Sequence, residues 1–406
     1  MAKNNYNTWT KEQLVDEIAR LRKRKKYGLV WEDKPEDVVE QCKTELPVLK
    51  EVKNKAIAKD KNGPVNILIE GDNYHALSVL NYTHKGKVDV IYIDPPYNTG
   101  AQNWRYNNNY VDADDAFRHS KWISFMSHRL AFAKKLLSER GFLICAIDAN
   151  ELFVIGLLLD ELFGVRNRIG LVTVLHNPKG RNFTKWFSAN SEYMLVYAKN
   201  ANVALFNDIA IDQEIKKSFN LVDKNGKRYR FEPFMRSRTE TLRENKPAFW
   251  YPVYVSKDLK HLTLEVSKGY YKVFPIAPNK KEATWINLPE TFEEKNKQGL
   301  FIAKMENGVV RIYRKFYEQQ IFKNVWLDQK YQSEFHGTNL LKIILGKNIF
   351  EYPKSLYLIL DILKITAKED SVILDFFAGS GTTGHAVLEL NKEDGGNRQF
   401  LSLIHI

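Results

Sequence analysis

The sequence predicts an α/β protein whose main domain contains a mostly parallel β-sheet covered by helices. Three observations predict this fold. Apolar strand-like runs alternate with helical periodicities over residues 66–148, a different pattern fills residues 170–337, and the alternation returns over residues 356–390. Alternation of strands with helices is typical of parallel sheets, because each helix carries the chain back across the sheet before the next strand.

The first alternating stretch supplies three strands and two helices. Short apolar runs predict strands at residues 66–70, 88–93 and 142–147. Helical spacing of apolar residues predicts helices at residues 74–81 and 121–137, and Gly141 follows the second helix as a stop signal. The later stretch predicts a helix at 356–365, a strand at 372–374 and a helix at 384–390.

The remaining segments divide the chain into four parts. Residues 8–26 have helical spacing and end in a basic run, and residues 33–62 are charged and resemble a linker with short helices. Between the two alternating stretches, aromatic and basic residues are interleaved in short β-like runs, as in 227–231 and 311–316. We therefore expect an N-terminal segment at 1–62, two halves of one α/β domain at 63–180 and 338–406, and an inserted domain at 181–337.

Composition narrows the class of protein. The 406 residues are 44% hydrophobic and 13% aromatic, which is ample for packed cores, and the net charge of +12 favours a polyanionic partner, nucleic acid first, although a basic soluble protein is the alternative. Two distant cysteines, Cys42 and Cys145, give neither a disulfide framework nor a metal site. The polar N-terminus and the short apolar run 152–163 predict a cytoplasmic protein without membrane spans.

The tetrapeptide Asp94-Pro95-Pro96-Tyr97 follows the predicted strand 88–93 directly. Open α/β sheets bind ligands at the carboxyl ends of strands. The exocyclic amino group of a base is a poor nucleophile, and a site activates it by accepting its hydrogens. The Asp94 carboxylate and the Pro95 carbonyl can accept one hydrogen each, while Tyr97 offers a flat face for an extruded base. The alternative is a Pro-Pro turn that only closes the strand.

Two further strand ends carry residues suited to a nucleotide-like cofactor. Asp375-Phe376-Phe377-Ala378-Gly379-Ser380-Gly381-Thr382 follows the strand 372–374, and glycines at such a turn let backbone approach a ligand closely. Gly71-Asp72 follows the strand 66–70, where an acid can accept a hydrogen bond from an adenine amino group. A tight turn in the first case and a helix cap in the second are the structural alternatives.

Taken together, these motifs resemble the amino-directed DNA methyltransferases, in the permuted group whose catalytic motif precedes the cofactor loop. Within that group, the chain is similar to the modification subunit of Type III restriction-modification systems. The matching stretches, in order, are ILIEGDNYHAL, VIYIDPPYNTG, WISFMSHRLAFAKKLL, FLICAIDANE, NPKGRN with EYMLVYAK, FEYPKS and ILDFFAGSGTTGHAV. The resemblance implies a Rossmann-like, S-adenosylmethionine-dependent methyltransferase sheet with an inserted target-recognition domain, here 181–337.

The resemblance also implies roles for individual residues. Asp94, Pro95, Pro96 and Tyr97 would grip a flipped adenine. The cofactor would contact Asp72, Asp375, Phe376, Phe377, Ala378, Gly379, Ser380, Gly381 and Thr382. Lys354 and Ser355 would close the far side of the pocket, and Asp148 and Glu151 would be mainly structural. Lys179, Arg181 and Lys185 are expected to contact DNA. Double-stranded DNA, a restriction subunit and a second copy of the chain are the expected partners.

One departure and three alternatives accompany the resemblance. In the family, the strand after the cofactor loop ends at an acid that binds the ribose; here Gln399-Phe400 is followed by LSLIHI. We therefore expect a truncated chain with a foreign tail, in which strand 399–404 leaves an apolar edge uncovered. Methylation of a cytosine amino group, methylation of an RNA base, and a catalytically impaired DNA-binding relative remain open at this point.

Overall fold

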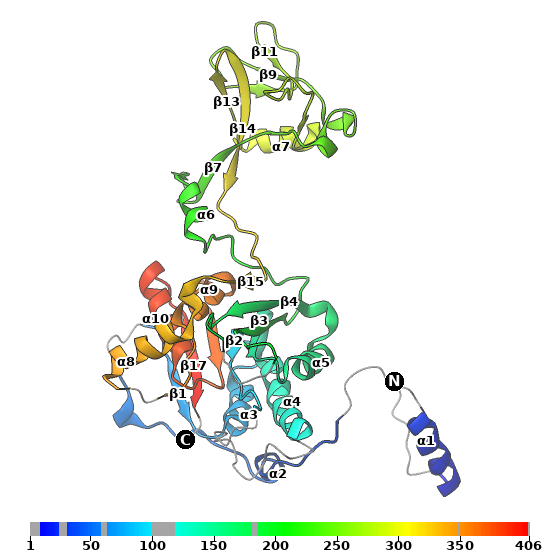
Figure 1. Ribbon diagram of the computed structural model, residues 1–406, viewed down its shortest axis with the longest axis vertical. Helices are drawn as coiled ribbons and strands as arrows, with labels where there is room; N and C mark the ends of the chain where they lie inside the picture. The colour runs from blue at the N-terminus through cyan, green and yellow to red at the C-terminus, as the bar shows by residue number, and fades with distance from the viewer. Residues whose placement is uncertain are drawn as a thin grey trace. The chain divides into compact units, whose positions relative to one another are not determined.

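The computed structural model describes residues 9–23, 31–57, 63–99, 118–180, 186–347 and 350–404. The chain forms two compact units, one of residues 1–207 and 323–406, and the other of residues 208–322 (Figure 1). Each unit has a hydrophobic core of its own.

An eight-stranded sheet forms the centre of the first unit. In sheet order the strands are β1 (Ile67–Glu70), β17 (Gln399–Ile404), β16 (Val372–Asp375), β2 (Val88–Ile93), β3 (Leu137–Ile147), β5 (Ser191–Ala198), β4 (Arg168–Leu175) and β15 (Val325–Trp326). Neighbouring strands are parallel except at β5, which runs antiparallel to β3 and to β4. The mainly parallel sheet predicted from the sequence is confirmed.

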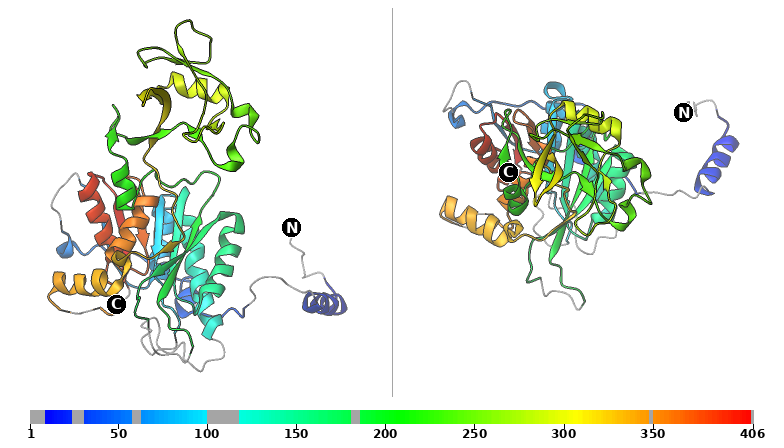
Figure 2. Two further views of the ribbon diagram at one scale, coloured as in Figure 1. Left: turned by 45° about the horizontal axis from the view of Figure 1, so that its top comes forward. Right: turned by 90° about the horizontal axis from the view of Figure 1, so that it is seen from above.

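Helices cover both faces of this sheet. They are α3 (Asn73–Thr83), α4 (Arg118–Leu136), α5 (Leu152–Phe163), α9 (Leu356–Thr366) and α10 (Thr382–Asp394). Helix α4 contacts both α3 and α5, whereas α9 contacts α10, and Figure 2 shows the two groups on opposite faces of the sheet. The strands and helices predicted for the two alternating stretches are all present, with shifted ends.

The largest shift is at β3, which begins at Leu137 rather than at the predicted residue 142. Leu137 pairs with Val88, and the register then jumps, so that Phe142 pairs with Val90. A Cβ at Gly141 would lie 2.9 Å from Leu137 Cδ2 and 3.0 Å from the Asp89 carbonyl oxygen. Gly141 therefore permits a tight irregularity inside the strand instead of acting only as a helix stop.

The expectation that β17 leaves an uncovered apolar edge is wrong. Strand β17 pairs on one side with β16 and on the other with β1, in parallel. Leu401 and Leu403 of this strand are buried in the core. The predicted edge ignored β1, which lies far away in the sequence and occupies the outer position of the sheet.

Shorter elements complete the first unit. They are α1 (Lys11–Lys23), α2 (Asp37–Gln41), α8 (Asn339–Leu345), the 3-10 turns Lys53–Lys55, Val165–Asn167 and Gln329–Tyr331, and the π-helical turn Glu334–Thr338. The predicted N-terminal helix and the predicted short helices of the linker are thus both present among the described residues. Within the part of the chain that the structure describes, no helix combines the length and the apolar character that crossing a membrane requires.

The second unit is built mainly from short antiparallel strands. One sheet has the order β13 (Phe301–Glu306), β14 (Val309–Tyr317), β7 (Arg228–Pro233) and β6 (Leu221–Val222). A second has the order β10 (Leu262–Thr263), β9 (Val253–Val255) and β11 (Tyr271–Val273), and β12 (Thr284–Trp285) pairs with β8 (Met235–Arg236). Helices α6 (Gln213–Ser218) and α7 (Pro289–Lys297) and the turns Thr239–Thr241 and Pro247–Phe249 lie between the strands.

The bounds of this unit lie inside the expected inserted domain, 181–337. Strand β5 and strand β15 fall within that range, but both pair with strands of the large sheet. The compact unit therefore covers 208–322. A sequence pattern could not separate them, because the apolar run of β5 resembles the short β-like runs of the second unit.

Packing within the second unit explains part of its interleaved basic and aromatic residues. Phe234 stacks on Trp285 with ring centroids 5.2 Å apart, and Phe292 and Phe301 join them in the core. The Arg314 guanidinium lies 2.8 Å from Glu232 Oε2. Some of the basic residues therefore hold the sheet together, and only the others are free to face a polyanion.

Candidate active site

Two of the predicted motifs meet at neighbouring strands. Strands β2 and β16 lie side by side and parallel, with Val90 opposite Ile373 and Ile91 opposite Leu374. Asp94 follows the last residue of β2, and Asp375 is the last residue of β16. Parallel strands end at the same edge of a sheet. The Asp-Pro-Pro-Tyr motif and residues 375–382, here called the glycine loop, therefore share one edge, although some 280 residues separate them in the sequence.

Asp94 lies in a cluster of polar side chains. Tyr97 donates a hydrogen bond from its hydroxyl to Asp94 Oδ1 at 2.7 Å. Lys354 Nζ lies 3.1 Å from the same oxygen and 2.8 Å from Glu192 Oε2, and it also donates to the Tyr97 hydroxyl. The structure thus brings the predicted catalytic residues together with Lys354 and adds Glu192, which the sequence analysis missed.

Burial and charge act in opposite directions on this cluster. Burial raises the pKa of Asp94, Lys354 opposes that rise, and Glu192 adds to it. Burial alone would lower the pKa of Lys354, but the carboxylates of Asp94 and Glu192 outweigh burial and raise it. Lys354 is 9% exposed, so its ammonium group is a nearly buried cation shared by two carboxylates.

Side chains of α4 and of neighbouring residues hold the backbone of the Asp-Pro-Pro-Tyr motif and the residue that follows it. Trp122 of α4 is fully buried and donates its indole N–H to the Pro96 carbonyl oxygen at 2.7 Å. Asn98 follows the motif with a φ of 53°, and its side-chain amide donates to Glu151 Oε1 at 2.5 Å. His119 Nδ1 lies 2.6 Å from the same oxygen. The sequence analysis included Trp122 only as part of the predicted helix 121–137.

The glycine loop has the conformation of a tight turn. The buried Asp375 carboxylate accepts from the Phe377 backbone N–H at 3.0 Å and from the Thr383 hydroxyl at 2.5 Å. Gly379 and Gly381 have φ values of 50° and 79°, a region that favours glycine. Burial raises the pKa of Asp375 to about 7, although both hydrogen bonds oppose the rise.

The other loop residues divide into buried and accessible ones. The side chains of Phe376, Phe377 and Ala378 are buried, so Phe376 offers a ligand its backbone rather than its ring. Ser380 and Thr382 are partly exposed, and their hydroxyl oxygens lie 3.0 Å apart. A Cβ at Gly379 would lie 2.9 Å from the ring of Phe350, so this glycine also permits a close approach.

Asp72 caps helix α3. Its Oδ1 accepts from the backbone N–H groups of Tyr74 at 2.7 Å and His75 at 3.3 Å. Beside it lies a cavity of about 320 Å³, within the size range of small-molecule sites. The cavity is lined by Gln41–Cys42, Glu45–Leu49, Ile69–Asp72, His75–Ala76 and Val79. A glycine turn and an acid at strand ends of one sheet suit an adenosyl cofactor, and the cavity is lined by Asp72 but by no residue of the loop 375–382.

The remaining predicted residues have local partners. Ser355 is fully buried and donates from its hydroxyl to the Lys330 carbonyl oxygen at 2.6 Å, so this bond links its segment to the turn at Lys330. Asp148 accepts from the Asn150 backbone N–H at 2.9 Å. Exposed Lys179 lies 3.5 Å from Glu334. Arg181 and Lys185 lie outside the described residues.

The sheet, the glycine loop and the acidic motif beside it are the arrangement expected of an α/β enzyme with a nucleotide-like cofactor at its strand ends. The chain belongs to the DNA methylase family, whose model matches residues 88–401. The Type III restriction-modification enzyme EcoPI Mod subunit of Escherichia phage P1 is 32% identical, over 88% of this chain and 60% of that protein. The Type II methyltransferase M.KpnI of Klebsiella pneumoniae is 34% identical, over 81% of this chain and 78% of that protein.

The chain thus spans less than two thirds of the phage P1 subunit that it matches. The same holds for the StyLTI Mod subunit of Salmonella typhimurium, which is 32% identical over 87% of this chain and 54% of that protein. Among solved structures, the M1.HpyAVI–SAM complex aligns over 84% of this chain and 94% of that chain, with 14% identity and a TM-score of 0.40.

Proposed function

We propose that this protein transfers a methyl group from S-adenosylmethionine to the exocyclic amino group of adenine in double-stranded DNA. The observation that carries the proposal is the meeting of Asp94 and the glycine loop at the ends of two adjacent strands, β2 and β16. Membership of the DNA methylase family and the similarity to Mod subunits and M.KpnI support it.

In the proposed mechanism, the target amine donates one hydrogen bond to the Asp94 carboxylate and one to the Pro95 carbonyl oxygen, and after methyl transfer the methylated nitrogen releases one proton, which the Asp94 carboxylate can accept. This pairing directs the nitrogen lone pair away from both acceptors, and the carboxylate stabilises the positive charge that develops on nitrogen. Trp122 keeps the motif in place through its hydrogen bond to the Pro96 carbonyl oxygen. Tyr97 supplies a ring on which the extruded base stacks.

The cofactor supplies an electrophilic methyl group carried on a sulfonium. Gly379, Ser380 and Gly381 would hold its methionine end, and the backbone at Gly381 has open space beside it that permits close approach. Asp72 and the cavity beside it would take its adenine. Asp375 orders the loop through its bonds to Phe377 and Thr383 and would act on the cofactor only through the loop.

Mass spectrometry of nucleosides from treated DNA tests the proposal. Duplex DNA of mixed sequence is incubated with the full-length protein and S-adenosylmethionine, then digested to nucleosides. Methyladenine in the wild-type reaction, absent from a parallel Asp94→Ala reaction, is the expected result. Methylcytosine in its place would show that the base assignment is wrong, and the absence of any methylated base would overturn the activity.

We further infer that the second unit, 208–322, recognises the DNA sequence. Its strands carry basic side chains that can contact phosphates, and others such as Lys304 that pack on aromatic rings. Replacing 208–322 by the equivalent unit of a relative should change which sequence is methylated. Retention of the original site with activity intact would place recognition elsewhere.

A restriction subunit and a second copy of this chain are the proposed protein partners. The first follows from the names of the relatives, which are Mod subunits of Type III restriction-modification enzymes. Light scattering after size exclusion, with and without a restriction subunit from the same genome, would measure both associations. A single species with the mass of one chain under both conditions would exclude them.

A further inference from the structure

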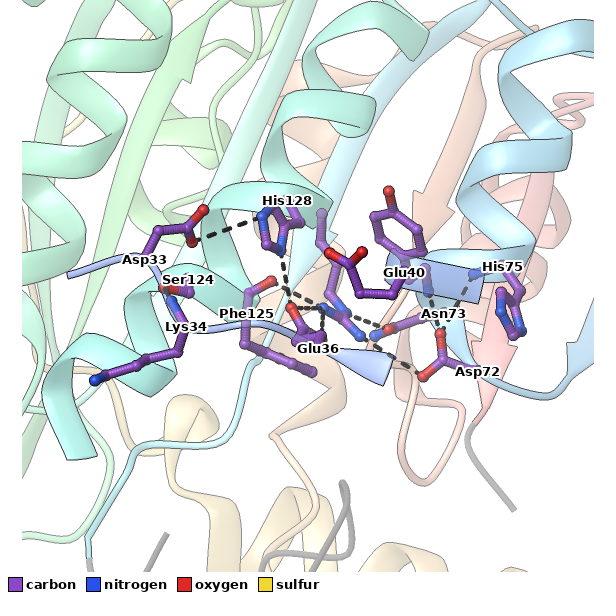
Figure 3. Close-up of polar contacts among 12 residues, drawn as sticks. Asp33, Lys34, Glu36, Glu40, Asp72, Asn73, His75, Ser124, Phe125 and His128 are labelled. Carbon is purple, nitrogen blue, oxygen red and sulfur yellow. Dashed lines mark hydrogen bonds and ion pairs between the residues drawn. The ribbon is translucent and has the colours of Figure 1, made fainter. Parts of the chain in front are cut away.

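The segment 31–57 lies outside the region that the DNA methylase model matches, which begins at residue 88. It is nevertheless attached to helix α4. The backbone N–H of Lys34 donates to Ser124 Oγ at 3.0 Å, and Trp31 packs against the core of the first unit. Figure 3 shows Lys34 and Glu36 of this segment beside Ser124 and His128 of α4.

Glu36 links this segment to two side chains of the helix, Arg129 and His128. Arg129 of α4 is 1% exposed, and its Nη1 donates to Glu36 Oε2 at 2.9 Å and to Oε1 at 3.2 Å. His128 Nδ1 lies 2.9 Å from Oε1. Burial alone would raise the pKa of Glu36, but His128 and Arg129 outweigh burial and hold it below its usual value. An ionised Glu36 thus compensates the buried Arg129, which would be strongly destabilising without a partner.

The Arg129 guanidinium is also connected to the glycine loop, through the side chain of Asn73. Arg129 Nε donates to Asn73 Oδ1 at 2.5 Å, and Asn73 Nδ2 donates to the Phe376 carbonyl oxygen at 3.0 Å. Asn73 is 2% exposed, and its two bonds fix its side-chain orientation. Because Phe376 lies in the glycine loop, a continuous path of hydrogen bonds runs from Glu36 to the loop backbone.

Arg129 also lies close to the other end of the predicted cofactor site. Its Nη2 is 3.6 Å from Asp72 Oδ2, and Figure 3 shows Asp72 and Asn73 side by side at the start of α3. The cavity beside Asp72 has residues 41–42 and 45–49 as one of its walls. The segment that carries Glu36 therefore also lines the cavity.

We propose that Arg129 is a positioning residue, and that its ion pair with Glu36 couples Glu36 and the cavity-lining residues 41–42 and 45–49 to the cofactor site. Arg129 holds Asp72 and Asn73 in place against Glu36, and through Asn73 it fixes the backbone at Phe376. Loss of the Glu36 carboxylate would therefore increase the mobility of both the glycine loop and the Asp72 side chain beside the cavity. The proposal rests on the proposed function insofar as the ligand is an adenosyl cofactor.

The test compares Glu36→Gln with Glu40→Gln in the full-length protein. Glu40 lies in α2, the helix that Glu36 precedes as N-cap residue, and its exposed carboxylate pairs with Lys43 instead of Arg129, so it is a matched control. Calorimetric titration with S-adenosylhomocysteine should show a Kd at least about threefold higher for Glu36→Gln, the size of effect expected from a residue that acts through others. Glu40→Gln should match wild type, and kcat at saturating S-adenosylmethionine should be retained in both.

A second measurement reads the loop directly. Hydrogen exchange of the amides of Phe376–Thr382, without any ligand, should be faster in Glu36→Gln and in Asn73→Ala than in Glu40→Gln. In the double variant Glu36→Gln/Asn73→Ala, these amides should exchange no faster than in Asn73→Ala alone, because both substitutions interrupt the same path of hydrogen bonds. Because this measurement uses no ligand, it tests the positioning role even if the wild-type protein does not bind S-adenosylhomocysteine. Absence of that binding would contradict the proposed cofactor and not the positioning role.

Two outcomes would overturn the positioning role. One is a loop whose exchange and ligand affinity in Glu36→Gln equal those of Glu40→Gln. The other is faster exchange spread evenly over β2, β3 and the loop, which would indicate general loss of stability. Arg129→Lys further distinguishes a positioning role from a general loss of stability, because lysine retains the positive charge but lacks the planar guanidinium group. This variant should bind S-adenosylhomocysteine more weakly, while the amides of the sheet remain protected from hydrogen exchange.

Discussion

Lys354 Nζ lies 3.1 Å from Asp94 Oδ1 and joins the two halves of the α/β domain at the candidate active site. Lys354 precedes α9, in the half that contains the glycine loop, whereas Asp94 follows β2 in the other half. Glu192, 2.8 Å from the same nitrogen, comes from β5. Three segments distant in sequence thus determine the charge state of the carboxylate proposed to act on the target amine.

The first prediction concerns Asp94. Asp94→Ala should lower kcat by about a hundredfold or more, because a charge-assisted hydrogen bond to the reacting group contributes about 3 kcal/mol. The Kd for S-adenosylhomocysteine should stay near the wild-type value, since Asp94 is proposed to contact the base. Single-turnover methylation and calorimetric titration would measure the two quantities, and a variant with near-normal turnover would remove Asp94 from the mechanism.

The second prediction is a pair of opposite pH shifts. Lys354 lowers the pKa of Asp94 and Glu192 raises it. Lys354→Met should therefore move the acidic limb of the kcat–pH profile to higher pH, with the largest rate loss at low pH. Glu192→Gln should move the same limb to lower pH.

Lys364→Met is the control for this pair, because Lys364 of α9 pairs with Glu393 of α10 instead of with Asp94 or Glu192. Its profile should coincide with that of wild type. Shifts of the same sign for Lys354→Met and Glu192→Gln would contradict the electrostatic coupling and indicate a change in packing.

The third prediction tests the support beneath the motif. Trp122→Phe removes the indole donor to the Pro96 carbonyl oxygen and should lower kcat by up to about tenfold, the equivalent of one hydrogen bond. Trp326→Phe removes a comparable indole bond, to the Lys323 carbonyl oxygen at 2.8 Å. Equal losses of kcat in the two variants would show that Trp122 affects stability rather than the motif.

The fourth prediction concerns stability and pH. Because the pKa of Asp375 is raised by burial to about 7, the folded protein holds this proton more tightly than the unfolded chain. Its contribution is fully present below the ordinary aspartate pKa and is lost as pH rises towards 7, by no more than about 4 kcal/mol.

Asp375→Asn should therefore flatten the decline in the free energy of unfolding between pH 4 and pH 7. Chemical denaturation at a series of pH values would measure it. Asp370→Asn, at an exposed turn before β16, is the control. A variant whose stability falls with pH as steeply as wild type would contradict the raised pKa of Asp375.

The sequence by itself determined the elements whose signals are local. Strand β2 is a mostly apolar run, interrupted by Asp89, that ends just before Asp94, and α10 begins two residues before its predicted start at 384, so both could be predicted from neighbouring residues. The same holds for the motifs at the strand ends, because parallel topology places them at one edge. The family resemblance followed from those motifs and their order.

Only the tertiary structure decided which distant residues face each other. It placed Lys354 and Glu192 on Asp94, and it placed β17 inside the sheet rather than at an edge. It also connected Glu36 to the glycine loop through Arg129, a residue that looks in the sequence like one more cation on an amphipathic helix. Periodicity reports which face of an element is buried, whereas pairing of side chains depends on how the elements pack, and that is a property of the whole chain.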